Sequence, residues 1–302
     1  QNLFNNNFVM DKKSFNQGLF LSAVGSFWWG FFGVLYFKYI SFAGHIEVVV
    51  HRSLWTAVTL LVTTIIFSKW RIFKEIIFNK KQLFILFLSG VLIFLNWAVW
   101  IYAVSSNQVI NASFGYFIMP ILSVFLGYFF FKEKLNKKRF VSISLVLVSI
   151  VYIFLIDFKS IPWVGISVAL SWGFYNLLRK KISVSTDIGL FIESLFILPF
   201  ILIVFYFITQ NNVNDFSLSN PILMLILMMA GPMTVIPLFL YVRGVELCGL
   251  GPTGMIFYIT PTLQFILGYF LFNEPFNINQ LVSFILIWIA VFIYLRDLYE
   301  NN

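Results

Sequence analysis

The segment Gly115–Phe140 returns once in the sequence, as Ile256–Leu281. A shift of 141 positions, with no gap, aligns five identical pairs, which are Pro120 with Pro261, Gly127 with Gly268, Tyr128 with Tyr269, Phe131 with Phe272 and Glu133 with Glu274. Matches at one fixed spacing indicate an internal duplication, which constrains every later assignment of elements. The chain is therefore predicted to contain two related halves of about 140 residues each.

The composition places these halves in a membrane. Of the 302 residues, 60% are hydrophobic and 11% are charged, whereas about a quarter of the residues of a soluble domain are charged. Apolar runs of roughly 17 to 25 residues recur, and each is long enough to cross a hydrocarbon core of about 30 Å as a helix. The runs lack the alternation of polar and apolar residues that barrel strands show. The sequence therefore predicts an all-α integral membrane protein.

Ten membrane-spanning helices are expected, five in each half. They are predicted at residues 18–37, 46–67, 82–104, 109–131, 140–156, 161–178, 188–208, 221–242, 251–272 and 280–295. The corresponding organisation is a cytoplasmic N-terminal tail at residues 1–17, a first repeat at 18–157, a second repeat at 158–297 and a cytoplasmic C-terminal tail at 298–302. Translation is expected to start at Met10, so that residues 1–9 carry no function.

The basic residues orient the predicted helices. Of the 20 Lys and Arg residues, 17 fall at one end of the helices, two (Lys38 and Lys159) fall at the other end, and Arg52 falls inside a helix. Because basic residues gather on the cytoplasmic side, this bias places both termini in the cytoplasm. The basic clusters, which include residues 179–181, are expected to lie over anionic lipid and not to bind nucleic acid.

Each predicted half holds an odd number of helices, so the second half must enter the membrane from the opposite side. Such halves are inverted repeats, which recur in secondary transporters with a binding site near the bilayer midplane. Small residues at four-residue spacing occur in the first helix of each half, at Ser22, Ser26 and Gly30 and at Gly165, Ala169 and Gly173. These stripes indicate either close helix packing or a surface on which the halves slide.

The sequence offers no constellation for catalysis. His45 and His51 are six residues apart, which is the wrong spacing for one helical face, and no cluster of cysteines or carboxylates accompanies them. No metal site is therefore expected. The lone Cys248 fits a small apolar filler of the core. No nucleotide-binding glycine fingerprint is present, and no cofactor is predicted.

Arg52 and Glu193 are the charged residues that the sequence places within helices, and they occupy equivalent positions of the two halves, 141 residues apart. A charge at such depth is costly and usually functional. Inversion would put the two on opposite sides of the midplane, about 12 Å apart in depth, which is too far for an ion pair. Both are predicted to face the interior, with Asn96 or Tyr241 as partners of Glu193. The alternative for each is a charge that reaches its nearer interface or is bonded to a neighbouring helix.

Further candidates for substrate binding or gating are polar and aromatic residues inside the predicted helices. With Arg52 and Glu193, they are Asn96, Trp100, Tyr116, Asn176, Tyr241, Tyr258 and Gln264. Trp28, Trp29, Trp97 and Trp172 also lie within helices, away from the interfacial belt where tryptophan is usual. Two interpretations remain open for these groups, which are the lining of a ligand cavity and simple hydrogen bonding or packing between helices.

Several short motifs resemble a known family. They are Trp29-Gly30, His51-Arg52-x-x-Trp55, Asn96-Trp97, Gly115-Tyr116-Phe117-Ile118-x-Pro120 and Pro261-Thr262-Leu263-Gln264-Phe265, followed by Gly268 and Phe272-x-Glu274-Pro275. Together they resemble the RarD group of EamA-type permeases, in the drug/metabolite transporter superfamily. The resemblance extends from Met10 to Leu295. It implies a ten-helix transporter of the bacterial plasma membrane, the inner membrane, with two EamA repeats and with the helices at 140–156 and 280–295 peripheral to a central cavity.

A secondary permease is the function that these observations predict. It would move a small metabolite or drug-like solute by alternating access of two inverted five-helix halves, as a monomer or homodimer and without enzymatic activity. The alternative is a membrane protein without transport, such as a scaffold, a sensor or an integral-membrane enzyme.

Overall fold

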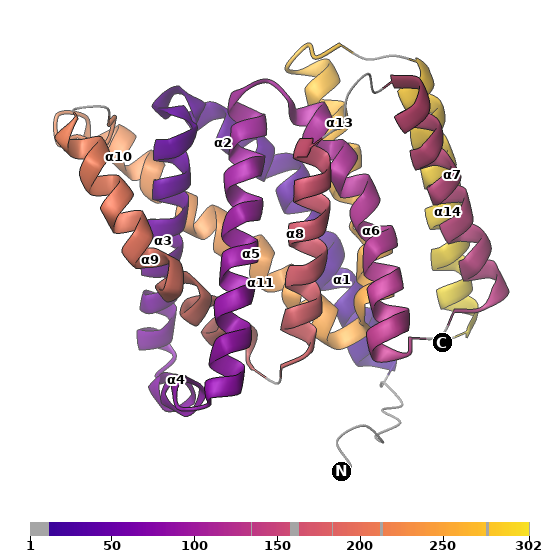
Figure 1. Ribbon diagram of the computed structural model, residues 1–302, viewed down its shortest axis with the longest axis horizontal. Coiled ribbons are helices and arrows are strands. Elements are labelled where there is room, and N and C mark those ends of the chain that lie inside the picture. The colour runs from indigo at the N-terminus through magenta and orange to yellow at the C-terminus, as the bar shows by residue number, and fades with distance from the viewer. Residues whose placement is uncertain are drawn as a thin grey trace.

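The computed structural model describes residues 12–133, 135–157, 163–182, 184–211, 214–275 and 278–301. All regular structure in these residues is helical (Figure 1). The first half contains α1 (Lys12–Trp28), the π-helix η1 (Trp29–Gly33), α2 (Val34–Tyr39), the 3₁₀-helix η2 (Ile40–Ala43), α3 (Gly44–Ile66), α4 (Trp70–Ile77), α5 (Lys80–Ser105), α6 (Val109–Phe131) and α7 (Lys137–Asp157). The second half contains α8 (Trp163–Lys180), α9 (Thr186–Gln210), α10 (Pro221–Met228), α11 (Ala230–Cys248), α12 (Leu250–Ile256), α13 (Ile259–Phe270) and α14 (Ile278–Asn301).

The all-helical prediction is confirmed, and the predicted helix at 109–131 coincides with α6 at both ends. Seven helical stretches in the described residues are long and apolar enough to cross a membrane. The first of them, Lys12–Ile66, contains both of the first two predicted helices in one continuous run. Each membrane crossing beyond these seven stretches remains a prediction.

Several predicted helix ends are wrong. Helix α1 begins at Lys12 and not at residue 18, and α11 continues to Cys248 and not to residue 242. The predicted ends were placed where charged residues begin. A helix can continue through such residues, because oppositely charged side chains three or four positions apart pair on its surface. Arg243 and Glu246 make such a pair in the last turns of α11, at 2.8 Å. The short helix α4 was not predicted, and it lies in the basic connection between α3 and α5.

Two of the predicted spans are broken helices. The break between α10 and α11 falls at Met229, and the break between α12 and α13 falls at Phe257 and Tyr258. Each break lies three or four residues before a proline, Pro232 or Pro261. A proline ring clashes with the carbonyl four residues earlier and removes a backbone hydrogen bond, so the chain bends at these points. Phe257 therefore lies at a bend and not within a regular helix.

The two copies of the duplicated segment cap each other. The carboxylate of Glu133, which follows α6, accepts hydrogen bonds from the backbone N–H groups of Leu250 and Gly251, both at 2.9 Å. The carboxylate of Glu274, which follows α13, accepts from Val109 at 3.2 Å and Ile110 at 2.9 Å. Glu274 thus satisfies free N–H groups at the start of α6, which Glu133 follows, and Glu133 does the same at the start of the α12–α13 pair, which Glu274 follows.

These contacts are reciprocal, because each member of one capping contact lies 141 residues from its counterpart in the other. The end of α6 meets the start of α12, and the end of α13 meets the start of α6, so the two copies run antiparallel. Residues 117 and 258, which also differ by 141, meet directly, because the Tyr258 hydroxyl donates to the Phe117 carbonyl at 3.0 Å. This self-complementary pattern is that of a twofold axis perpendicular to the two helices.

The bundle has a centre and two edges (Figure 1). Helices α7 and α14 lie side by side at one edge, and hydroxyl-to-carbonyl bonds such as Ser149 to Ser283, at 2.8 Å, join them. Helices α3, α9 and α10 form the opposite edge. Between the edges, α5, α6, α8, α11 and the α12–α13 pair, together with α2, contribute to the largest cluster of buried apolar side chains in the described residues. The start of α1, the end of α14 and the connection that holds α4 lie at the same end of the bundle.

Candidate functional site

Arg52 of α3 is buried, with 4% of its surface exposed. Its guanidinium carbon lies 4.7 Å from the ring centre of Phe37, 4.9 Å from that of Trp97 and 5.4 Å from that of Trp100. Aromatic faces attract a cation at such distances. The Nε and Nη1 atoms of Arg52 have no hydrogen-bond partner among the described residues. The rings therefore stabilise the charge and leave these two donors free.

A small cavity adjoins this guanidinium. The residues that line it are Trp29, Arg52, Asn96, Trp97, Trp100, Tyr116, Trp172, Phe257, Thr260 and Gln264. Its volume is about 20 Å³, which is room for about one water molecule. The walls come from both halves of the chain, namely from η1, α3, α5 and α6 of the first half and from α8 and the α12–α13 pair of the second.

The aromatic cluster at this cavity follows the internal duplication. Tyr116 and Phe257 are equivalent residues, 141 positions apart, and their ring centres lie 5.4 Å apart. Trp29 and Trp172 occupy corresponding places in the first helix of each half, and their rings meet edge to face at 4.9 Å. The cavity therefore lies where equivalent residues of the two halves meet.

Glu193 of α9, the counterpart of Arg52, is buried in a different environment. Its carboxylate accepts hydrogen bonds from the Ser89 hydroxyl at 2.6 Å and the Tyr175 hydroxyl at 3.2 Å. The Nη1 atom of Arg179 lies 3.5 Å from the same carboxylate. These three residues are its partners, and the predicted partners Asn96 and Tyr241 are wrong.

Arg179 corrects a second prediction. The sequence places it with Lys180 and Lys181 in a cytoplasmic cluster, but only 3% of its surface is exposed. Its guanidinium occupies the space where Gly189 of α9 lacks a side chain, because a Cβ atom added there would lie 1.8 Å from Nη1. Consecutive residues of a helix point about 100° apart. Arg179 therefore faces α9, while Lys180 binds Glu133 at 2.7 Å.

The family model described as the EamA-like transporter family matches residues 16–155 and again residues 159–296. Protein RarD of Escherichia coli (strain K12) is 32% identical over 288 residues, which cover 95% of this chain and 97% of that protein. An uncharacterized transporter of Vibrio cholerae is 32% identical over 95% of this chain, and the uncharacterized transporter YojE of Bacillus subtilis is 33% identical over 92% of it. This chain belongs to the EamA-like transporter family.

Five of the nine residues predicted to bind or gate a substrate line the small cavity beside Arg52, which is called the central cavity below. They are Arg52, Asn96, Trp100, Tyr116 and Gln264. The other four do not line the cavity. Tyr241 packs against Trp172 at 5.5 Å, Asn176 donates to the Trp172 carbonyl at 2.9 Å, Tyr258 donates to Phe117, and Glu193 makes the contacts described above.

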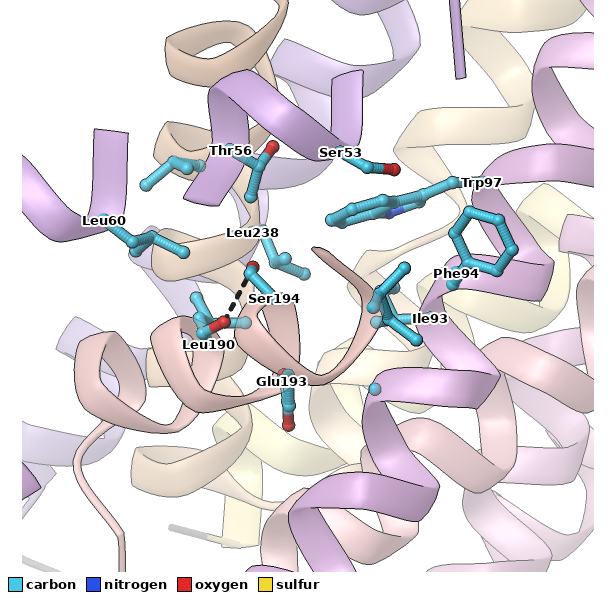
Figure 2. A pocket seen from close by; sticks show the side chains of 13 residues that line it. Ser53, Thr56, Leu60, Ile93, Phe94, Trp97, Leu190, Glu193, Ser194 and Leu238 are labelled. Carbon is cyan, nitrogen blue, oxygen red and sulfur yellow. Dashed lines mark hydrogen bonds between the residues drawn. The ribbon is translucent and has the colours of Figure 1, made fainter. Parts of the chain in front are cut away.

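Glu193 borders a second, smaller cavity of about 10 Å³ (Figure 2). Ser53 and Thr56 of α3 and Trp97 of α5 lie on one side of this space, and Ser194 of α9 lies on the other. The Ser194 hydroxyl is bonded to the Leu190 carbonyl at 2.9 Å, and the Glu193 side chain points away from the two hydroxyls of α3. The second cavity is therefore mostly apolar, and it shares Trp97 with the central one.

Three lining or neighbouring residues were not singled out from the sequence. Phe257 could have been found, because it is the duplicate of the candidate Tyr116. Thr260 and Phe37 carry no signal of their own in an apolar helix. The buried Glu47 was also not predicted, and its carboxylate is hydrogen-bonded within the protein. It accepts from the backbone N–H groups of Asp215 at 2.9 Å and Phe216 at 3.2 Å, next to His51 at 3.3 Å.

Proposed function

We propose that this chain is a secondary transporter of the plasma membrane that moves a small metabolite or drug-like solute by alternating access. Ten transmembrane helices would form two inverted five-helix halves, with both termini in the cytoplasm. The observation that carries this proposal is the central cavity, which combines a buried and incompletely bonded Arg52 with walls from both halves. In transporters built from inverted repeats, substrates bind at such an interface near the midplane.

The small volume of the cavity fits a closed conformation of such a cycle. A space of about 20 Å³ is far below the several hundred Å³ of a small-molecule site, so binding requires the halves to separate. Irregular backbone lies where this movement would occur, because Trp29 begins the π-helix η1 and Phe257 lies at the bend between α12 and α13. Such sites absorb changes in helix direction without unfolding the helix.

A scaffold, a sensor or an enzyme is the alternative, and each fits the cavity less well. A scaffold has no need of a buried cation whose donors lack partners, since such a group is costly to keep in a membrane. An enzyme would place acid–base or nucleophilic groups together. Arg52 is the ionisable group with a fixed charge in this cavity wall, and the described lining residues include no carboxylate, histidine or cysteine.

Uptake into vesicles tests the proposal. Purified protein in proteoliposomes, incubated with a small-molecule extract of bacterial cells, is expected to accumulate at least one solute above the level of protein-free liposomes, as measured by mass spectrometry. Arg52→Ala, reconstituted at equal density, is expected to lower this uptake at least tenfold, because it removes the polar group of the site. Equal contents in protein-containing and protein-free liposomes would contradict the transporter function.

The orientation of the chain makes a separate prediction. In a Cys248→Ala background, Ser106→Cys should react with an impermeant thiol reagent added to intact cells, and Lys81→Cys should react after the cells are opened. Both positions are exposed and lie at opposite ends of α5, one at its start and one just after its last residue. Cys248 is the single cysteine of the sequence, so the Cys248→Ala background contains no other thiol. The opposite labelling pattern would reverse the proposed topology.

We also propose that anionic lipid contacts the basic cytoplasmic connections, and that the functional unit is a monomer or a homodimer. The first proposal follows from the excess of basic residues at one end of the helices.

A further inference from the structure

We propose that the central cavity binds a monoanionic carboxylate, with the carboxylate at Arg52 and an apolar or aromatic body against the surrounding rings. This inference names the substrate class of the proposed transporter and rests on that function for its physiological meaning. Binding itself can be tested without transport.

The charge of the cavity wall is the first argument. Arg52 is the one formally charged side chain among the described residues that line the cavity. Its counterpart Glu193 is not available to neutralise it, since Ser89, Tyr175 and Arg179 surround that carboxylate. The site therefore carries one positive charge. One guanidinium matches one carboxylate in charge and in its forked geometry, whereas a phosphate dianion would bring a negative charge that the wall does not balance.

The free hydrogen-bonding atoms are the second argument. Besides Nε and Nη1 of Arg52, four indole N–H groups of the cavity wall are buried without a partner among the described residues. They belong to Trp29, Trp97, Trp100 and Trp172. Guanidinium and indole nitrogens are donors and never acceptors. Among the fully buried side-chain atoms without a partner in the described residues, the acceptor at this wall is the Gln264 side-chain oxygen. A wall with this excess of donors fits a ligand whose polar group accepts hydrogen bonds.

The remaining walls define the rest of the solute. Trp29, Trp172, Tyr116 and Phe257 form one continuous cluster of rings, with neighbouring ring centres 4.9 to 6.3 Å apart. Aromatic side chains stack on flat apolar groups, and removing both surfaces from water is favourable. A carboxylate attached to a ring or a short apolar chain satisfies both parts of the site. A purely polar anion would leave the rings without a partner.

Matched pairs of probes test the inference. The panel is acetate, benzoate and 3-phenylpropionate, each compared with the neutral amide of the same shape, at pH 7.5 with purified protein in detergent. Tryptophan fluorescence reports binding, because four indoles line the cavity. At least one aromatic carboxylate is expected to bind at least tenfold more tightly than its amide, and acetate is expected to bind more weakly than benzoate.

Three variants assign the effect to Arg52. Arg52→Gln should weaken binding of the carboxylate at least tenfold and bring it to the level of the amide. Arg52→Lys keeps the positive charge but loses the two parallel N–H donors of the guanidinium. It should therefore retain part of the preference for the carboxylate over the amide. Arg243→Gln is the control, because it removes an exposed arginine outside the cavity, and it should bind like the wild type.

Two results would overturn the inference, namely no preference for any carboxylate of the panel over its amide, or an unchanged preference in Arg52→Gln. These outcomes are distinct from failure of the transporter function. Vesicles that accumulate neutral or cationic solutes, from protein that does not prefer carboxylates, would sink the inference and leave transport standing. If carboxylate binding depends on Arg52 but vesicles take up no solute, the inference about the ligand stands and the proposed transporter function is contradicted.

Discussion

Gly115→Ala is expected to destabilise the protein and to abolish any activity of the cavity beside it. Helices α6 and α8 approach so closely at this point that a Cβ on Gly115 would lie 2.1 Å from the carbonyl oxygen of Gly165. The obstacle is backbone and not a movable side chain, so the two helices must separate. Overpacking of this kind typically costs about 1–3 kcal/mol, and Tyr116, which lines the cavity, is the next residue. Thermal unfolding in detergent measures the effect.

Gly33→Ala is the matched control. A Cβ at Gly33 would meet its nearest neighbours at 3.5 and 3.6 Å, which is ordinary contact. The same substitution there adds a methyl group without a clash, and alanine favours helix by up to about 1 kcal/mol. Gly33→Ala is therefore expected to unfold at the wild-type temperature or slightly above it. Equal stability of the two variants would show that α6 and α8 are not in backbone contact.

The same contact illustrates what the sequence could predict. The stripe of Gly165, Ala169 and Gly173 indicated a close helix approach, and Gly165 indeed contacts the backbone of α6. The partner helix and the facing residue, Gly115, could not be named, because the stripe specifies one surface and not what packs on it. The duplication was more informative. It paired Glu133 with Glu274, and the structure gives these two residues the same role at opposite ends of the paired helices.

For the candidate site, the burial of the charged side chains was predictable and their contacts were not. An arginine inside an apolar run had to be buried or to reach an interface, and Arg52 is buried. The partners of Glu193 depend on the axial position at which α9 packs against α5. The difference between the predicted Asn96 and the observed Ser89 is two helical turns, or about 10 Å, a shift that hydrophobic patterning does not fix. Arg179 was misassigned because its neighbours in sequence are surface lysines, although each points in another direction.

The buried contact between Arg179 and Glu193 leads to the second large prediction. Arg179→Met is expected to destabilise the protein by about 3–5 kcal/mol, because it leaves a carboxylate buried without its cation. The Ser89 and Tyr175 hydroxyls still donate to Glu193, but they carry no charge. The surrounding space cannot supply another cation readily, since only 3% of the Arg179 surface and 2% of the Glu193 surface are exposed. Chemical denaturation in detergent measures the loss.

A double-mutant cycle separates the charge from the packing. Glu193→Gln keeps the shape of the side chain and one of its two acceptor oxygens and removes its charge, so Arg179→Met combined with Glu193→Gln should recover most of the stability that Arg179→Met loses. Arg243→Met is the matched control, because Arg243 contacts Glu246 at 2.8 Å on an exposed surface, where such a pair contributes at most about 1 kcal/mol. If the double variant is as unstable as the sum of the single variants, Arg179 acts through its packing and the buried charge of Glu193 does not depend on it. Recovery in the double variant would instead show that α8 and α9 are joined by an ion pair whose two charges are retained together.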